Sequence, residues 1–486
     1  MRKFSLGILA ILLLGWSCTE DEGEITVLLT EEVLHVSGEQ IRILGRLITN
    51  QPISASDHGF YISLDESFSS PIIISLGSKD GAGKFIGETD DLVIGKSYFA
   101  KAYMDMGNGV EFGNVIEVST LTPELKSFSP VFGSATDILT ISGRNFTKDT
   151  RVFFNDVEAE ILKIELESRL TVRIPAPSSS QQVFIKVLIQ DEPLNFATPF
   201  EYQTGKYELL GTFPEDIKLY DNVSFQNQAG FYIGLGAISK NHLYEGFQRY
   251  NPVSSTWEKI SWLGSSRSYA FATSNFIGGG IAQLGRDPFI MNYGFWKTSS
   301  SGFQKLGDLP FESRESLAFE VNQDLFVIGS KEGDSLAVRK YAALTGQWTN
   351  LRPSPVALGA TNPHFQYQGK TYFVDNSAKL WMYDPSLDLW SNTGAIYPGS
   401  LGLGYGIAQV IGDKAYVGLY RRANDIWELD IPTMTWKSKN TIPGIPQSFT
   451  VGSFVYDKSL YIMRVPDISL AGSYRMELYK FDPNGI

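Results

Sequence analysis

Tyr250-Asn251-Pro252, Tyr383-Asp384-Pro385 and Leu429-Asp430…Pro432 are copies of one turn, and each is followed by a tryptophan seven residues after its first position. Weaker copies lead from Trp296 to Phe303 and from Tyr341 to Trp348, and Phe481-Asp482-Pro483 begins a sixth. The second aromatic residues, at positions 257, 303, 348, 390 and 436, are therefore 42 to 46 residues apart. A period of this length with several strands per repeat is typical of a β-propeller.

The missing half of the sixth repeat lies at the start of this region. Tyr207-Glu-Leu-Leu-Gly-Thr-Phe-Pro214 is similar to Phe303-Gln-Lys-Leu-Gly-Asp-Leu-Pro310. We therefore expect residues 206–213 to supply the outer strand of a last blade whose other strands come from the C-terminal end of the chain. Such closure removes sheet edges that an incomplete ring would expose. The sequence predicts six blades over residues 205–486.

Glycine-rich strands precede several of the turns, as in Asn275-Phe-Ile-Gly-Gly-Gly280 and Leu325-Phe-Val-Ile-Gly-Ser330. A glycine doublet, a Tyr-Asp-Pro-like turn and a later tryptophan resemble the blade of the kelch propeller family. The doublet is kept best at Gly278-Gly279, so the resemblance implies a divergent kelch-like ring over residues 205–486. We expect the repeated tyrosine and tryptophan side chains to pack blade against blade.

The N-terminal segment has the form of an export signal. Residues 1–3 carry positive charge, the apolar run from Phe4 to Trp16 is too short to span a bilayer, and Cys18 is the only cysteine. The segment resembles the lipobox of bacterial lipoproteins, although Gly15 stands where that family prefers leucine. The resemblance implies that residues 1–17 are a signal peptide and that Cys18 carries the lipid that holds the protein at a membrane; a plain secreted protein is the alternative.

An acidic stretch follows Cys18, so that residues 18–24 form a tether. In Bacteroidota-type lipoproteins, acidic residues at this place are a signal for export to the outer face of the outer membrane. The expected location is therefore the outer membrane, exposed at the cell surface. The other interpretation of these residues is a solvated linker without a signal.

Two β-rich modules are predicted between the tether and the ring. In residues 25–122, Gly59-Phe-Tyr-Ile-Ser63 and the later Gly95-Lys-Ser-Tyr-Phe-Ala-Lys-Ala-Tyr103 resemble fibronectin type III-like modules. In residues 123–204, Leu139-Thr-Ile-Ser-Gly-Arg-Asn-Phe146 resembles the IPT/TIG immunoglobulin-like domain, in which Gly143 is expected to permit a tight turn and Phe146 to return to the core. The predicted fold is all-β: two immunoglobulin-like β-sandwich modules followed by a six-bladed kelch-like β-propeller.

Composition and motifs exclude several kinds of chemistry. A net charge of −12 argues against nucleic acid as a partner. The four histidines have no metal-ligand spacing, and no P-loop or Gly-x-Ser-x-Gly motif occurs. The copper centre of the architecturally similar galactose oxidase needs a cysteine-linked tyrosine, and the only cysteine is Cys18. We therefore predict no catalytic residues, metal or cofactor.

Two arginines occupy matching positions in successive repeats. Arg267 in Gly264-Ser-Ser-Arg267 and Arg314 in Glu312-Ser-Arg314 both precede a predicted inner strand. Two guanidinium groups on one rim suit a carboxylated sugar or an acidic peptide. In the alternative interpretation each arginine binds neighbouring carbonyls and stabilises its loop. Further candidate ligand-binding residues are Tyr269, His364, Tyr405, Arg421 and Arg422.

Two classes of function remain open. The favoured one is a surface-anchored, non-enzymatic binding lipoprotein that presents a kelch propeller to a glycan or an extracellular protein. The alternative is a metal-independent sugar-modifying enzyme resembling the kelch sialic-acid mutarotases. A structural component of an outer-membrane complex is a third possibility.

Overall fold

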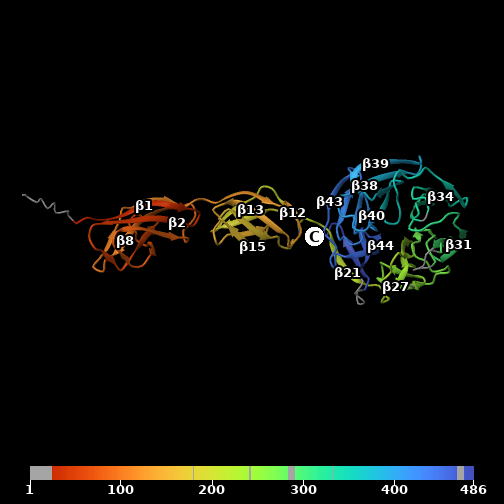
Figure 1. The fold of residues 1–486 in the computed structure, drawn as a ribbon, viewed down its shortest axis with the longest axis horizontal. Coiled ribbons are helices and arrows are strands. Elements are labelled where there is room, and N and C mark those ends of the chain that lie inside the picture. Colours follow the sequence, from red (N-terminus) through yellow and green to blue (C-terminus); the bar gives the residue numbers. More distant parts are fainter. Residues whose placement is uncertain (1–23, 179, 240–241, 283–289, 332, 468–474) are drawn as a thin grey trace, which may run out of the picture. The chain divides into compact units, whose positions relative to one another are not determined.

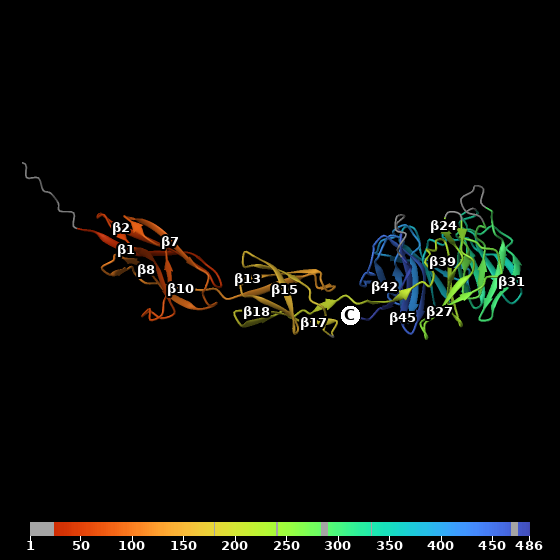
Figure 2. The same cartoon turned by 90° about the horizontal axis from the view of Figure 1, so that it is seen from below.

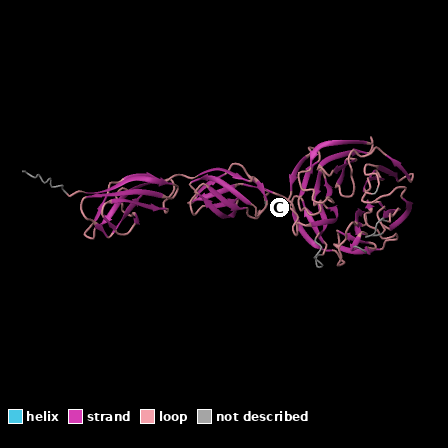
Figure 3. Cartoon of the chain, viewed as in Figure 1, coloured by secondary structure: helices cyan, strands magenta, loops and turns pink. Residues whose placement is uncertain are grey.

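The computed structural model describes residues 24–178, 180–239, 242–282, 290–331, 333–467 and 475–486. The regular structure of these residues is all β-strand, with no helix among them (Figure 3). Accordingly, the described part of the chain contains no helix able to cross a membrane. The predicted signal peptide, Cys18 and all of the tether but Glu24 lie outside the described residues.

The chain divides into two compact units. Figure 1 labels their strands in chain order. The N-terminal unit comprises residues 1–178 and 182–200, and the C-terminal unit comprises residues 179–181 and 201–486. This division places the predicted ring in one unit and groups the two predicted sandwich modules in the other.

The first part of the N-terminal unit is built from residues 26–119. One sheet has the order β1-β2-β7, a second has the order β10-β8-β4-β5 with β9 paired to β8, and β3 pairs with β6. The core between them contains Ile41, Ile43, Phe60, Phe85 and Tyr98, because alternate residues of a strand point to the same face. The strand bounds are β1 Thr26–Val36, β2 Ile41–Thr49, β3 Ser54–Ala55, β4 Asp57–Ser63, β5 Ile72–Ser75, β6 Lys79–Asp80, β7 Gly83–Thr89, β8 Ser97–Asp105, β9 Val110–Phe112 and β10 Ile116–Ser119.

The second part contains a sheet of order β11-β13-β16-β15-β14-β18-β19 and a small sheet of order β12-β20-β17. Phe146 is buried, as the sequence predicted. Gly143, however, lies inside β13, and a Cβ there would collide with the Phe146 ring and the Glu124 carbonyl. A close approach rather than a tight turn therefore requires this glycine. The bounds are β11 Glu124–Ser129, β12 Phe132–Gly133, β13 Ile138–Arg144, β14 Arg151–Phe154, β15 Val157–Glu165, β16 Arg169–Arg173, β17 Gln182–Val183, β18 Ile185–Ile189, β19 Glu192–Asn195 and β20 Phe200–Tyr202.

The C-terminal unit contains six four-stranded antiparallel sheets, which we number in chain order. Sheets 1 to 5 each use strands that follow one another along the chain, apart from a short β24–β25 pair inserted into sheet 1. The bounds are, for sheet 1, β22 Val223–Asn227, β23 Gly230–Gly234, β26 Phe247–Asn251 and β27 Thr256–Ile260, with β24 Ala237–Ser239 and β25 His242–Leu243; for sheet 2, β28 Phe271–Ala272, β29 Phe276–Gly278, β30 Gly294–Ser299 and β31 Gly302–Asp308; for sheet 3, β32 Leu317–Val321, β33 Asp324–Ile328, β34 Val338–Ala342 and β35 Gln347–Asn350. For sheet 4 they are β36 His364–Tyr367, β37 Lys370–Val374, β38 Lys379–Asp384 and β39 Leu389–Ile396, and for sheet 5, β40 Ile407–Ile411, β41 Lys414–Gly418, β42 Ile426–Asp430 and β43 Thr435–Ser438.

Sheet 6 joins two distant parts of the chain. Its order is β44-β45-β46-β21, with β44 Ser448–Tyr456, β45 Ser459–Pro466, β46 Glu477–Asp482 and β21 Lys206–Thr212. Lys206 lies opposite Asp482 and Thr212 opposite Glu477 in the antiparallel pairing of β21 with β46. Residues 206–213 were predicted to pair with the C-terminal strand, and this pairing is present.

Aromatic side chains pack between neighbouring sheets of the C-terminal unit, whose strands Figure 2 shows from a second direction. The Phe303 ring of sheet 2 stacks on Phe247 of sheet 1 at 5.3 Å between centroids. Trp348 of sheet 3 lies 5.4 Å from Phe295 of sheet 2. These repeated aromatic residues therefore bury apolar area between sheets, which confirms the packing role predicted for them.

Candidate functional site

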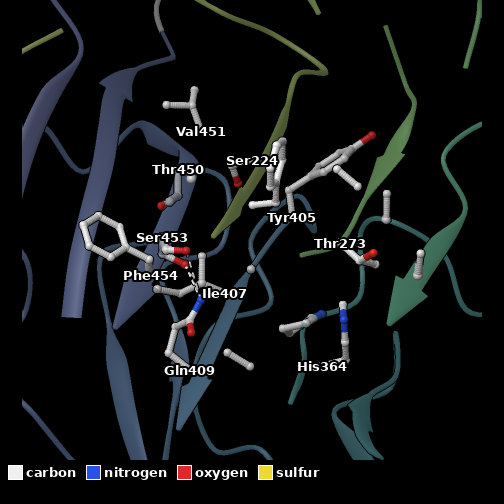
Figure 4. A pocket seen from close by; sticks show the side chains of 18 of the residues that line it. Ser224, Thr273, His364, Tyr405, Ile407, Gln409, Thr450, Val451, Ser453 and Phe454 are labelled. Carbon is white, nitrogen blue, oxygen red and sulfur yellow. Dashed lines mark hydrogen bonds between the residues drawn. The ribbon is translucent and has the colours of Figure 1, made fainter. Parts of the chain in front are cut away.

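The C-terminal unit encloses a cavity of about 650 Å³. Its walls include residues of β22, β28, β32, β36, β40 and β44, which are the first strands of the six sheets and which we call the inner strands. Figure 4 shows side chains from several of these strands, among them Ser224, His364 and Gln409, around the same space, together with Thr273 directly after β28. Polar and apolar side chains share the wall about equally, and a concavity of this size with convergent polar groups is the usual setting of a small-ligand site.

One end of the cavity, which we call the mouth, is formed by the residues that lead into the inner strands. Four of these residues stand two positions before an inner strand and have left-handed backbone conformations, with φ of 50°, 58°, 54° and 54°: Asp221, Tyr269, Glu315 and Tyr405. Backbone strain of this kind costs of order 1–3 kcal/mol per residue and is concentrated at functional sites.

Backbone hydrogen bonds run from sheet to sheet along the mouth. The Tyr269 amide donates to the Asp221 carbonyl at 2.9 Å, and the Glu315 amide donates to the Tyr269 carbonyl at 3.0 Å. The series continues with Ala360 N to Glu315 O at 2.8 Å and Tyr405 N to Thr361 O at 2.9 Å. The strained conformations are thus held by bonds between successive sheets, and the side chains are not needed for this purpose.

The side chains of these four residues form two tyrosine–carboxylate pairs. The Tyr269 hydroxyl donates to the Asp221 carboxylate, and the Tyr405 hydroxyl donates to Glu315 Oε2 at 3.3 Å. Burial, reinforced by nearby Glu315, raises the pKa of Asp221, against the opposing effect of the Tyr269 bond. Burial also raises the pKa of Tyr269 to about 12, so this hydroxyl remains a proton donor at neutral pH.

Arg421 lines the cavity but is bound to a carboxylate of the protein itself. Its Nε and Nη2 atoms donate to the two Asp467 oxygens at 2.9 and 3.0 Å. Arg422, beside it, donates from Nε to Asp467 Oδ2 at 2.7 Å. This pairing raises the pKa of Arg421 and, together with Arg422, lowers that of Asp467.

His364 lies on β36 in the cavity wall, where Figure 4 shows its ring next to the open space. Burial lowers the pKa of His364 to about 4, so the imidazole is neutral at physiological pH. Among the described residues, no group of histidine, cysteine and carboxylate side chains could hold a metal ion. The cavity therefore offers hydrogen bonding and aromatic contact.

At the opposite end, glutamine side chains link neighbouring inner strands. Gln409 Nε2 donates to the Ser453 carbonyl at 3.1 Å, and Gln226 Nε2 donates to the Val455 carbonyl at 3.2 Å. Gln366 makes the same kind of bond to the Glu320 carbonyl. We call this end the glutamine end. Its polar side chains are used to join sheets.

Three residues predicted for the ligand site are not in the cavity wall: Arg267, Arg314 and Arg422. Arg267 is 1% exposed, and its guanidinium donates to the carbonyls of Ser265, Gly279 and Gly294 at 2.8–3.2 Å. Burial lowers its pKa to about 10. Arg267 therefore has the loop-stabilising geometry that was the alternative interpretation, because its donors face backbone carbonyls rather than the cavity.

Arg314 is also buried, at 6% exposure, and its guanidinium lies 5.0 Å from the centre of the Tyr269 ring. It therefore supports the mouth from behind, and the expectation that the two arginines form the centre of a ligand site does not fit this geometry. Of the other predicted residues, Tyr269, His364, Tyr405 and Arg421 do line the cavity, whereas Arg422 does not.

Sequence reasoning missed Asp221 and Glu315. Both occupy the position that Tyr269 and Tyr405 hold in other repeats, two residues before the inner strand. Aligning the repeats by their inner strands rather than by their arginines brings these four residues into one column. The signal was therefore present in the spacing.

Comparison with family models finds an IPT/TIG domain at residues 123–202. No curated protein matches the chain. Among solved structures it is similar to a structural genomics protein of unknown function from Bacteroides thetaiotaomicron, at 13% identity and a TM-score of 0.36, over 74% of this chain and 98% of that one. It is also similar to the structure of YjhT, at 14% identity and a TM-score of 0.42, over 55% of this chain and 96% of that one. Residues 123–202 are an IPT/TIG domain, which confirms the second predicted module.

Proposed function

We propose that residues 205–486 form a six-bladed kelch-like β-propeller. Six four-stranded sheets in this region support the proposal, as does the cavity to which every inner strand contributes. The pairing of β21 with β46 supports closure of the ring, because it covers an edge of sheet 6.

We further propose that the protein is a non-enzymatic binding lipoprotein, anchored through Cys18 at the outer face of the outer membrane. The fibronectin type III-like module proposed for residues 25–122 and the IPT/TIG domain act as spacers for the propeller. The ligand is a glycan or an extracellular protein, bound at the mouth of the cavity.

The single observation that carries the binding role is the chemistry of the mouth. Tyr269 and Tyr405 combine an aromatic face with a hydroxyl, and Asp221 and Glu315 place carboxylate oxygens beside them. Aromatic rings next to planar polar groups suit sugar rings, which present C–H faces and hydroxyl edges. This favours a glycan over a protein as the ligand.

A sugar-modifying activity is the second candidate, and Asp221 is the observation that favours it. A carboxyl group whose pKa is raised by burial, next to a tyrosine hydroxyl, has the environment of a general acid or base. Such an enzyme would resemble the kelch sialic-acid mutarotases in working without a metal.

The test compares the full chain with Tyr405→Phe, which removes only the hydroxyl that donates to Glu315. The matched control is Tyr456→Phe on β44, outside the cavity wall. Binding to a glycan array and to surface proteins is measured, and bound sugars are followed by NMR for turnover. We expect saturable binding that Tyr405→Phe weakens about fivefold, as for one lost hydrogen bond, and that Tyr456→Phe leaves intact. Product formation would establish the enzyme instead, and a Tyr405→Phe variant with full affinity would remove the mouth as the site.

The anchor is tested separately with Cys18→Ser. Loss of the lipidated cysteine should release the protein from the membrane fraction or leave the precursor uncleaved. A fully processed Cys18→Ser variant that stays with the membrane would contradict the proposed lipid anchor.

A further inference from the structure

Three charged side chains line the mouth: Asp221, Glu315 and Arg421. Their partners decide which ligand charge the mouth can accept. Glu315 is paired with Lys331, whose Nζ lies 3.0 Å from Glu315 Oε1. Arg421 is paired in two-pronged fashion with Asp467, as described above.

The Arg421 guanidinium therefore binds Asp467 of the protein itself. A ligand carboxylate needs two parallel N–H donors for strong recognition by arginine. Two of the Arg421 donor nitrogens already bind Asp467, whose side chain is only 8% exposed. Arg421, the one Lys or Arg side chain in the cavity wall among the described residues, thus has two of its donors bound to a buried carboxylate, which it shares with Arg422.

Asp221 differs from Glu315 and Arg421 in the kind of partner that its side chain has. No ion pair of Asp221 within 4.0 Å is found among the described residues, and its partner is the neutral Tyr269 hydroxyl. An ionised carboxylate only accepts hydrogen bonds, so a ligand group placed against Asp221 has to donate one. A hydroxyl or an amine meets this requirement, whereas a ligand carboxylate would bring a like charge into a partly buried site, where charges are poorly screened.

We propose that Asp221 and Tyr269 make the mouth selective for neutral or amine-bearing sugars and against carboxylated sugars. This inference rests on the proposed function and names its ligand class. It reverses the expectation from the sequence that paired arginines would bind a carboxylated ligand, because Arg267 and Arg314 are buried away from the cavity wall.

The first test presents galactoside chains to the full-length protein in three forms: unmodified, with a terminal amine-bearing sugar, and with a terminal uronate or sialate. Glycan-array signals and dissociation constants are compared between the forms. We expect the first two forms to bind roughly tenfold or more tightly than the third, which corresponds to about 1.4 kcal/mol. Binding restricted to the carboxylated form would overturn the inference while leaving the proposed binding function intact.

The second test uses Asp221→Asn on the same probes. The amide keeps an acceptor for Tyr269, removes the charge and adds a donor. The ratio of the dissociation constants of the carboxylated and unmodified chains should therefore fall towards one. The matched control is Asp216→Asn, which removes the same charge from a side chain that is 70% exposed and outside the cavity wall. The control should keep the wild-type preference, because general repulsion by an acidic protein is equal in both variants.

Three further results contradict the inference, and each is distinct. An unchanged preference in Asp221→Asn removes Asp221 as its cause, and an equal change in Asp216→Asn assigns the preference to the net charge. Absence of binding to every galactoside form and to all other array glycans overturns the sugar specificity. The proposed function itself is overturned only if extracellular proteins also fail to bind.

Discussion

Hydrogen bonds join neighbouring sheets at both ends of the cavity, but side chains make them at one end and the backbone makes them at the other. At the glutamine end, side chains of Gln226, Gln366 and Gln409 carry the hydrogen bonds between neighbouring inner strands. At the mouth, backbone amides and carbonyls of residues such as Tyr269 and Glu315 carry them. The side chains of the mouth therefore do not have to join the sheets, and they pair with one another, with Lys331 or with Asp467, whereas those of the glutamine end make the links themselves.

This difference explains why strained backbone is found at the mouth. A left-handed conformation turns the amide of Tyr269 or Glu315 towards the previous sheet, where it bonds the matching carbonyl. The strain is offset by these bonds between neighbouring sheets, so the tyrosine and carboxylate side chains are not needed to join the sheets. The comparison therefore predicts that mutations at the glutamine end affect stability, whereas mutations of the mouth side chains affect ligand binding.

The largest expected effect is that of Arg267→Met, which tests whether buried residues behind the mouth are structural. Methionine fills a similar volume but leaves the Ser265, Gly279 and Gly294 carbonyls without their donor. We expect a loss of roughly 3 kcal/mol in unfolding free energy, since buried unsatisfied polar groups cost about 1–3 kcal/mol each and the loop can relax in part. Urea unfolding measures it, with the exposed Arg352→Met as control. Unchanged stability together with lost ligand binding would contradict this structural role and would show that Arg267 belongs to the ligand site.

A smaller effect is expected from Gln409→Ala at the glutamine end. The change removes the bond to the Ser453 carbonyl between sheets 5 and 6 and should lower the unfolding free energy by about 1 kcal/mol. Gln347→Ala on β35, an exposed position, is the control. Ligand affinity should stay at the wild-type value in both variants. A reduced affinity in Gln409→Ala would show that the glutamine end also contributes to binding.

The all-β class and the four-stranded sheets of the C-terminal unit were predictable from sequence because they depend on repetition along the chain. The spacing from Tyr250 to Trp257 and its copies determines where each sheet turns, and the similarity of residues 207–214 to 303–310 predicts the pairing of β21 with β46. The turn positions follow from alternation and turn chemistry, which are local, whereas the pairing of β21 with β46 follows from the similarity between repeats.

The candidate site was predictable only in part, because side-chain direction depends on contacts between sheets. Arg267 and Arg421 both look like rim residues in the sequence, yet one faces carbonyls of its own loops and the other faces Asp467, 46 residues away along the chain. Asp221 was missed because the repeats were compared through their arginines. Matching positions therefore predicted which residues lie near the mouth but not which of them face the cavity.

The smallest expected effect on stability is that of Asp221→Asn, and it tests the comparison most directly. Because burial raises the folded-state pKa of Asp221 above the ordinary aspartate value of 3.8, ionisation disfavours the folded state. Wild-type stability should therefore fall as pH rises from 3.8 through the raised pKa and be constant above it with respect to this group. Asp221→Asn lacks this loss, so its advantage over wild type should be absent below pH 3.8 and largest at neutral pH. Unfolding midpoints of wild type, Asp221→Asn and Asp216→Asn across this range measure it. If Asp221→Asn loses as much stability at neutral pH as Gln409→Ala, the mouth side chains are structural too, and the separation between the two ends is wrong.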